Sequence, residues 1–224
     1  MELNVQQIKR CFGRKEVLRD VSFTARSGQT VGLLGANGSG KSTLLRILAG
    51  VLPAQGGACL WEGRDLLREA KLRAETVAYV PQGTPLLEEL SARDNLRLWY
   101  EPEALERSLE EGVLRRLGVG EFLKTPAGKL SGGMKKRLSI GCAMARSPGI
   151  LLLDEPTAAL DLAGKEQILS CFEDFCRADG LLLMATHDPM ELALCDSWLL
   201  LEQGAVQHYA YDGDVRALAG RLRG

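Results

Sequence analysis

The chain has 224 residues, of which 46% are hydrophobic and 25% are charged, and its formal net charge is −1. This composition suits one globular domain, or one domain with a small insertion, and the balanced charge gives no support for a nucleic-acid partner. The first ten residues lack the apolar centre of a signal peptide and the longest apolar runs are too short to cross a bilayer, so we expect a cytosolic chain that is able to dock on a membrane protein.

The first third of the chain is rich in strand patterns. LNVQQI (3–8) and VLRDVSFTA (17–25) alternate apolar and polar residues, which predicts antiparallel strands. QTVGLL (29–34) predicts a buried strand, and a helix is expected from residue 41 to about residue 49, before Gly50 and Pro53. Residues 77–80 predict a further short strand.

Residues 35–42, GANGSGKS, match the pattern GxxxxGK[ST] between a predicted strand and a predicted helix. The glycines allow the loop to curl so that successive N–H groups point inward, and the start of the next helix adds partial positive charge. We expect Lys41 to reach the β- and γ-phosphates of a nucleoside triphosphate, Ser42 to offer its hydroxyl to Mg²⁺, and Thr43 to assist with phosphate oxygens. The predicted binding residues are Gly35, Asn37, Gly38, Ser39, Gly40, Lys41, Ser42 and Thr43.

The composition changes between residues 83 and 129. LSARDNLRLWY (90–100) and EALERSLEEGVLRRLG (103–118) have the pattern of charged amphipathic helices, and Ser91 with Asp94 forms an N-terminal capping pattern. We interpret residues 83–129 as a helical subdomain inserted into one catalytic core made of about 1–82 and 130–224. Two interpretations of its apolar residues stay open, a groove for a membrane-protein helix or the subdomain's own core; these residues are Leu86, Leu87, Leu90, Leu96, Leu98 and Trp99.

LSGG (130–133) precedes a helix expected over about 131–145. Farther along, ILLL (150–153) and LLLMAT (181–186) are continuous apolar runs, which predict parallel strands covered on both faces and joined by a helix over 162–177. WLLLEQGAVQHY (198–209) predicts a hairpin turning at Gln203 and Gly204, followed by one short helix.

Asp154 and Glu155 come directly after the first of these buried runs. Ligands gather at the carboxyl ends of the strands in a parallel α/β sheet. We therefore expect Asp154 to hold Mg²⁺ through its water shell and Glu155 to orient or deprotonate an attacking water. The alternative is a strand that ends in charge because it reaches solvent.

Taken in order, these motifs resemble the nucleotide-binding subunits of ATP-binding cassette transporters over nearly the whole chain. The resemblance is carried by GANGSGKS as the Walker A loop, ILLLDE (150–155) as Walker B, Gln82 in YVPQG as the Q-loop, LSGGM (130–134) as the signature, AALD (158–161) as the D-loop and His187 in ATHD as the switch histidine. Phe12 stands where the family has an aromatic residue that stacks on adenine. Three positions depart from the commonest pattern without removing a catalytic group, namely Met134, Ala158 and Phe12.

The resemblance implies an α/β fold with a P-loop NTPase core and a mostly parallel sheet, an N-terminal antiparallel β subdomain and an inserted helical subdomain. It also implies ATP hydrolysis with Mg²⁺. His187 is expected to bond the γ-phosphate and to hold Glu155 and the water in place. Gln82 is expected to contact the ion or the water, so that its loop reports the nucleotide state to the helices at 91–116.

The resemblance further implies that LSGG serves a second subunit. Ser131 and the N–H groups of Gly132 and Gly133 form an anion-binding helix start, which in the family faces the ATP held by the opposite subunit. Two subunits, as a homodimer or as a heterodimer with a close relative, would meet head-to-tail about a two-fold axis, with Asp161 bridging between them. The next three basic residues are either a solvated face or attract the partner's triphosphate; they are Lys135, Lys136 and Arg137.

We therefore expect the ATPase subunit of a membrane transporter, peripheral on the cytoplasmic face and docked on integral membrane subunits. GMKKRLSIGCAMA (133–145), ARDNLRLWY (92–100) and the short C-terminus are more similar to exporter-type cassettes, while an importer stays open. The other alternative is a non-transport cassette that acts on nucleic acid. In those proteins a long coiled coil separates Walker A from the signature, whereas here that interval is under one hundred residues without sustained heptads, so no nucleic acid is expected.

Overall fold

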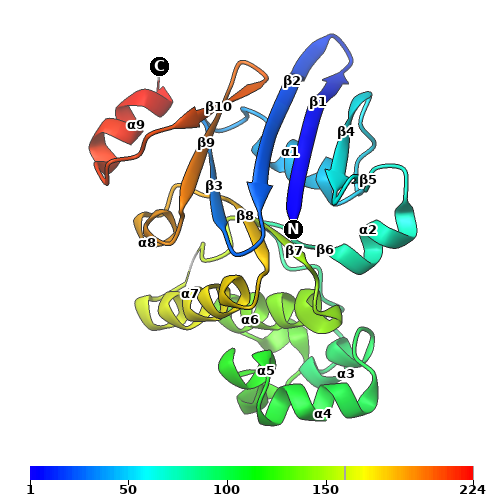
Figure 1. The fold of residues 1–224 in the computed structure, drawn as a ribbon. Helices are drawn as coiled ribbons and strands as arrows, with labels where there is room; N and C mark the ends of the chain where they lie inside the picture. The colour runs from blue at the N-terminus through cyan, green and yellow to red at the C-terminus, as the bar shows by residue number, and fades with distance from the viewer. Residues whose placement is uncertain (159, 224) are drawn as a thin grey trace.

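The computed structural model describes residues 1–158 and 160–223, and in this part of the chain one mixed sheet of ten strands runs through the molecule (Figure 1). Its strand order is β5-β4-β1-β2-β10-β9-β3-β8-β7-β6. The strands are β1 (Glu2–Phe12), β2 (Lys15–Arg26), β3 (Thr30–Leu34), β4 (Gly56–Trp61), β5 (Arg64–Asp65), β6 (Val77–Val80), β7 (Ile150–Asp154), β8 (Leu181–Ala185), β9 (Ser197–Glu202) and β10 (Ala205–Tyr209).

The connections between the strands hold most of the helices. The α-helices are α1 (Lys41–Leu48), α2 (Ala70–Thr76), α3 (Ala92–Arg97), α4 (Pro102–Glu110), α5 (Val113–Arg116), α6 (Gly132–Ala143), α7 (Leu162–Arg177), α8 (Pro189–Ala193) and α9 (Val215–Arg223). Short 3₁₀ turns lie at η1 (Val119–Phe122), η2 (Ala127–Lys129) and η3 (Met144–Arg146). Across the residues described, no helix combines the length and the apolar character that a membrane crossing requires.

The sheet has a parallel half and an antiparallel half. Strands β6, β7, β8, β3 and β9 are parallel neighbours, and they include the buried strands expected from the continuous apolar runs. Strands β2, β1, β4 and β5 pair antiparallel, as the alternating N-terminal pattern predicted for β1 and β2. The halves meet at β10, which pairs with β9 across the predicted turn at Gln203 and Gly204 and touches β2 at one parallel pair, Ala205 with Asp20.

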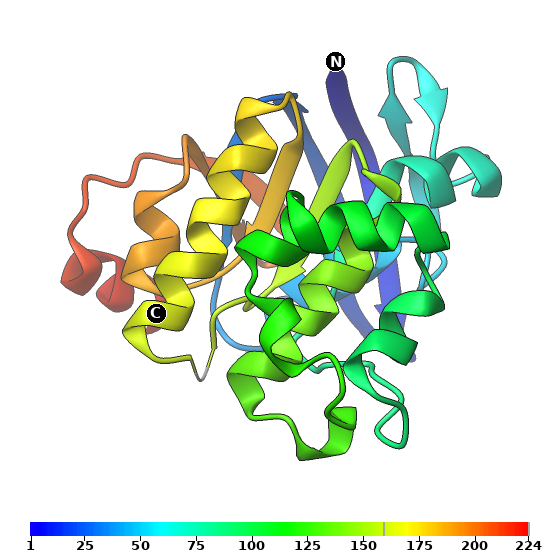
Figure 2. The same ribbon diagram turned by 90° about the horizontal axis from the view of Figure 1, so that it is seen from below.

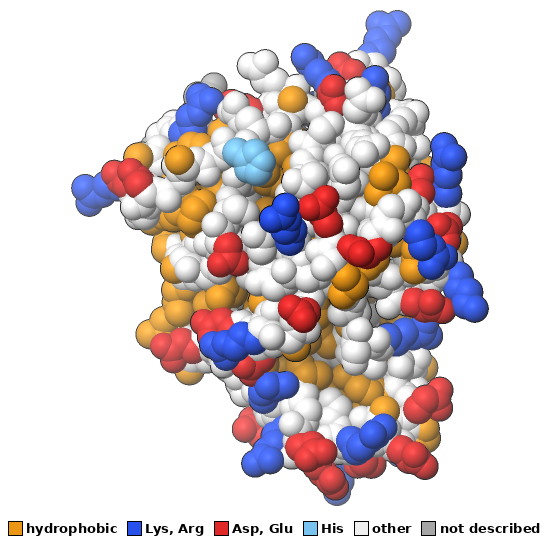
Figure 3. Space-filling model, in the orientation of Figure 1, with side chains coloured by type: hydrophobic (Ala, Val, Ile, Leu, Met, Phe, Trp, Pro, Cys, Tyr) orange, Lys and Arg blue, Asp and Glu red, His pale blue; other side chains and the backbone are white. Residues whose placement is uncertain are grey.

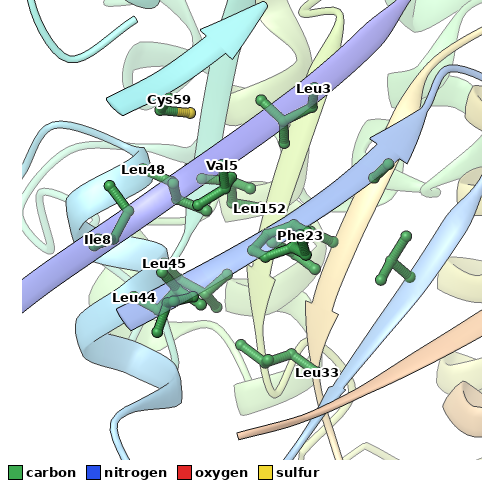
Figure 4. Packing of buried hydrophobic residues seen from close by; sticks show 14 of the residues in the cluster. Leu3, Val5, Ile8, Phe23, Leu33, Leu44, Leu45, Leu48, Cys59 and Leu152 are labelled. Atoms are coloured by element: carbon green, nitrogen blue, oxygen red, sulfur yellow. The ribbon is translucent and has the colours of Figure 1, made fainter. Parts of the chain in front are cut away.

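Helix α1 lies between the two halves of the sheet, as Figure 4 shows from close by. Its Leu44, Leu45 and Leu48 pack between Leu3, Val5, Ile8 and Phe23 of the antiparallel half and Leu33 and Leu152 of the parallel half. Apolar burial on both sides fixes the direction of α1. The helix start, and with it the end of the preceding glycine loop, is held against the sheet.

The opposite face of the parallel half is covered by α6, α7 and the helices between residues 92 and 122 (Figure 2). Leu138 of α6 and Ile168 and Phe172 of α7 pack with Leu151, Leu153 and Leu182 of the sheet. On the face drawn in Figure 3 basic and acidic side chains are interspersed, in agreement with the small net charge.

One expectation about local structure is corrected, and one open question about the apolar residues of 86–99 is answered in part. The amphipathic stretch 103–118 is two helices, because α4 ends at Glu110 and α5 begins at Val113. The apolar set in 86–99 is divided: Leu96 is fully buried in the helical cluster, whereas Leu98 and Trp99 are 58% and 55% exposed. Neither a groove for a membrane-protein helix nor a core of the helical segment therefore accounts for all of these residues.

Candidate functional site

The glycine loop between β3 and α1 is packed too closely for side chains at two positions. Gly35 has φ 155°, and a Cβ there would lie 2.7 Å from the carbonyl oxygen of Leu201. Gly40 has φ 113°, in the left-handed region, and its Cβ would lie 2.9 Å from Val17 Cγ1. Glycine is the residue that adopts such angles without steric cost. The loop is thus fixed against β9 on one side and β2 on the other.

Lys41, the first residue of α1, folds back over this loop. Its Nζ donates hydrogen bonds to the carbonyl oxygens of Gly35 (2.6 Å) and Ala36 (3.1 Å). Burial lowers the pKa of the Lys41 ammonium, and the negative charges of Glu155 and Asp154 oppose this change. The lysine therefore lies within electrostatic reach of both carboxylates that the sequence pattern singled out.

Those carboxylates follow each other at the end of β7. Asp154 is buried, and the Tyr79 hydroxyl donates a long hydrogen bond of 3.5 Å to its Oδ2. Glu155 has a φ of 49°, and its N–H donates to the carbonyl oxygen of Ala185 at the end of β8. A left-handed conformation in a non-glycine residue is costly and is often found at functional sites. Strand β7 ends at Asp154, directly before this residue.

Three loops bring Gln82, Glu155 and His187 together. Gln82 follows β6, and its Nε2 donates a 2.8 Å hydrogen bond to Glu155 Oε2. His187 follows β8, and its Nδ1 lies 3.7 Å from Glu155 Oε1, with 63% of the histidine side chain exposed. The carboxylate thus has an amide on one oxygen and an imidazole near the other. All three groups lie at the carboxyl ends of parallel strands, where the chemistry was expected from the sequence.

The donor set beside the glycine loop fits Mg²⁺. Asp154 is a buried carboxylate with one long hydrogen bond in the described chain, and a buried charge of this kind is stabilised by a cation. Ser42 and Gln82 add a hydroxyl and an amide oxygen, and hard oxygen donors are those that Mg²⁺ prefers.

Phe12, the candidate adenine-stacking residue, lies at the end of β1 and is 47% exposed. The guanidinium carbon of Arg10 lies 4.9 Å from the centroid of its ring, and Arg10 Nη1 donates to the carbonyl oxygen of Pro53. This cation–π contact, which was not predicted from the sequence, covers one face of the ring.

The LSGG residues lie at a separate hollow. Ser131 caps α6, since its Oγ accepts a hydrogen bond from the Met134 N–H (3.2 Å), and Gly132 and Gly133 form the first helical turn. A hollow of about 940 Å³ is lined by Ser131, Gly132, Gly133, Arg137 and Asp161 among others. The first three residues of the glycine loop, Gly35 to Asn37, instead line a hollow of about 500 Å³ with His187 and α9. One chain therefore presents its two candidate phosphate-binding elements at two different places.

Asp161, the last residue of the AALD segment, starts helix α7. Its Oδ1 accepts a hydrogen bond from the Gly164 N–H at 2.9 Å, so the side chain acts as an N-terminal cap. Asp161 also lines the LSGG hollow. Ala159 of the same segment lies outside the described residues.

The expectation for the basic residues after LSGG is corrected. Lys136 is only 4% exposed, and its Nζ donates to the carbonyl oxygens of Pro81 (3.1 Å) and Gln82 (3.2 Å). Arg137 donates to Gln167 and to the carbonyl oxygen of Leu117, and Lys135 pairs with Glu88. A solvated basic face is therefore wrong for Lys136. The sequence carried no signal for this, because a lysine in a first helical turn usually faces solvent.

Glu191, on α8 just after the switch histidine, was not predicted from the sequence. This carboxyl is 1% exposed, and its Oε1 accepts from the N–H of Thr157 at 2.8 Å and from the Thr157 hydroxyl. Lys165 of α7 forms an ion pair with Asp188, which directly precedes α8. These contacts join the loop after β7 to the loop after β8.

Comparison with known proteins agrees with this geometry. A family model described as ABC transporter matches residues 18–158. The chain is 32% identical over 209 residues to the linearmycin resistance ATP-binding protein LnrL of Bacillus subtilis, covering 90% of this chain and 67% of that protein. It is 33% identical over 223 residues to the putative hemin import ATP-binding protein HrtA of Staphylococcus epidermidis, covering 93% of this chain and 100% of that protein.

Solved structures give the same result. The structure of an ATP-binding subunit of an ABC transporter superimposes with a TM-score of 0.84 at 29% identity, covering 100% of this chain and 95% of that one. A dimeric bacterial ABC transporter cassette superimposes with a TM-score of 0.82 at 25% identity, covering 92% and 96%. The α/β fold with a P-loop NTPase core is thereby confirmed.

Proposed function

The chain belongs to the ABC transporter family, and from that premise we propose that it powers a membrane transporter through ATP-dependent dimerisation and hydrolysis. Cassettes of this family bind ATP and are ATPases. The observation that carries the proposal is the meeting of Gln82, Glu155 and His187 at the strand ends that flank Lys41.

In this proposal each residue has one task in hydrolysis. Lys41 and the N–H groups of the glycine loop bind the β- and γ-phosphates, and His187 contacts the γ-phosphate. Glu155 orients the attacking water and accepts its proton while the water oxygen bonds to the γ-phosphorus and the bond to the β–γ bridging oxygen breaks, giving ADP and phosphate. Ser42, Asp154 and Gln82 would hold Mg²⁺, which neutralises charge on the transferred phosphate.

We propose that the second element of the site comes from another copy of the chain, or from a close relative. The support is the separation of the two hollows, with Ser131 to Gly133 and Asp161 at one and the glycine loop and His187 at the other. A head-to-tail arrangement about a two-fold axis places each against its counterpart. Each ATP then joins two chains, and Phe12 stacks on its adenine.

The proposed membrane partner docks between the sheet and the segment 83–129, which we treat as the helical subdomain. A groove of about 370 Å³ lies there, and its apolar lining includes Tyr79, Leu86, Trp99 and Cys142. We propose that a helix of an integral membrane subunit fills it at the cytoplasmic face. Export is the direction we favour, on the similarity of 92–100 and 133–145 to exporter-type cassettes; one of the relatives described above is named for import.

A matched pair of variants tests the proposal. Glu155→Gln keeps the shape of the side chain but cannot accept the proton, so it should retain ATP binding, lose turnover by about 10³-fold or more and accumulate an ATP-dependent dimer. Lys41→Ala should fail at ATP binding and stay monomeric. Light scattering with and without ATP, together with phosphate release, separates these outcomes. Turnover by Glu155→Gln at the native rate would refute the assignment.

A further inference from the structure

Lys136 is buried in a place that connects two parts of the proposed site. It belongs to α6, whose first residues are the LSGG element, and its Nζ reaches across to the main chain of Pro81 and Gln82. Gln82 in turn holds Glu155 through its side-chain amide. An unbroken series of hydrogen bonds thus runs from the LSGG helix through Lys136 and Gln82 to Glu155.

The burial of this ammonium needs explanation, because removing a charge from water costs several kcal/mol unless it is paired. The two carbonyl oxygens satisfy part of that need, and the negative charges of Asp154, Glu191 and Glu155 attract the ammonium as well. A neutral side chain would fill the same space without that cost. We therefore look for a function of the contact between Lys136 and the loop that contains Gln82.

We propose that Lys136 is a positioning residue that couples the Gln82 loop of one ATP site to the LSGG helix that the same chain offers to the other ATP site. This inference rests on the proposed function. Gln82 moves with the ligand at its own site, Lys136 holds the main chain of that residue, and α6 carries the displacement to Ser131, Gly132 and Gly133. When one structural element contacts two sites, binding at one site changes the affinity at the other, and a mutation in that element can change the size of this effect.

Lys135 supplies a matched control on the same helical turn. Its Nζ pairs with Glu88 at 3.0 Å, with 22% of the Lys135 side chain and 68% of the Glu88 side chain exposed, and an ion pair that is open to solvent on one side contributes little. The test uses the full chain with Lys136→Met, Lys135→Met, Gln82→Ala and the double variant Lys136→Met with Gln82→Ala. Methionine keeps a flexible stem of similar length without the charge, and thermal unfolding verifies that each variant folds.

Three measurements are made on each variant: ATP affinity of the dilute monomer, dimerisation with a non-hydrolysable ATP analogue, and turnover. Lys136→Met should leave monomer affinity within about twofold, since it does not touch the glycine loop, and should weaken dimerisation and turnover about tenfold, within the range usual for coupled sites. Lys135→Met should match the native chain. With Gln82→Ala already present, Lys136→Met should have little further effect, because the route is already cut.

The inference is overturned if Lys136→Met dimerises and turns over as Lys135→Met does. It is equally overturned if the effect has the same size with and without Gln82, or if monomer affinity falls in parallel, since each result indicates a purely structural role. If the native chain itself does not dimerise with the analogue, the proposed function fails and the inference fails with it. The native control therefore distinguishes the two failures.

Discussion

Glu191 shows how a single residue departs from what its position in the sequence indicates. A glutamate on a short helix near the surface is normally solvated, yet this carboxyl is buried against Thr157, and its Oε2 has no hydrogen-bond partner within the described residues. Burial raises the pKa of the Glu191 carboxyl, and the hydrogen bonds from Thr157 offset this only in part. The residue joins the loop that carries Glu155 to the helix that follows His187.

The raised pKa gives Glu191 a predictable effect on stability. Below the usual glutamate pKa the protonated carboxyl stabilises the folded state relative to the unfolded one, and this contribution is lost as pH rises through the raised folded-state pKa. The Glu191→Gln variant serves as the reference, because it has no ionisable group at this position. The free energy of unfolding of the native chain minus that of the variant should therefore fall as pH rises from about 4, with a slope that approaches about 1.4 kcal/mol per pH unit between the two pKa values. Urea denaturation at several pH values measures the difference; curves that stay parallel would contradict it.

The placement of residues that depends on local pattern was predictable from the sequence, whereas contacts between distant residues were not. Glu155 and Lys41 follow from a strand end and a glycine loop, each recognisable within about ten residues of sequence. The partners of Lys136 and Glu191 lie 55 and 34 positions away along the chain. No periodicity reports such a contact, because burial of an ionisable group is decided by the packed elements around it.

At the scale of elements, the fully buried strands were the easiest to predict. β3, β7 and β8 are buried along their whole length and mostly apolar, because both faces of this part of the sheet are covered. β4, β5 and α2 were not predicted, since GGACLW opens with two glycines and β5 has only two residues. β4 pairs with β1 and β5 pairs with β4, so both strands depend on the register of the antiparallel half rather than on their own sequence.

The break between α4 and α5 can be tested by a substitution at Gly112. The expected change in the free energy of unfolding has one sign if 103–118 is a single helix and the opposite sign if it is two helices. In one continuous helix, Gly112→Ala would stabilise by about 0.5–1 kcal/mol. In the structure a Cβ at Gly112 would lie 2.7 Å from the Ser108 Cα, so the same change should destabilise by about 1–3 kcal/mol. Gly120→Ala is the control, because its Cβ would meet open space and should change stability by less than about 0.5 kcal/mol. Chemical denaturation of both variants distinguishes the two.

At the scale of the whole molecule, the arrangement of the two phosphate-binding elements follows from the sheet. The glycine loop leaves β3 toward α1 on one face, whereas LSGG begins α6 on the opposite face, and the strands between them keep the two apart. Both motifs were recognised in the sequence, but their location in two separate hollows is seen only in the structure. This separation is what makes a second chain necessary in the proposed function, and mixing two disabled chains tests it.

The first disabled chain carries Lys41→Ala, which removes the ammonium over the glycine loop. The second carries Gly132→Glu, which places a carboxylate where the anion should bind; a Cβ there meets open space, and an acidic residue suits a helix start, so α6 should remain folded. Each chain alone should turn over ATP at least about 100-fold more slowly than the native chain, because both of its shared sites lack one element.

An equal mixture should recover activity, because a dimer of one chain of each kind joins the intact glycine loop of the Gly132→Glu chain to the intact LSGG of the Lys41→Ala chain. Such a mixed dimer has one intact site and one site that lacks both elements. Turnover should therefore rise above that of either chain alone and reach at most about half of the native value if the sites act independently. Gly132→Ala, mixed in the same way, controls for changes of shape without charge. If each ATP were served by elements of a single chain, no mixture of these two variants would exceed its components.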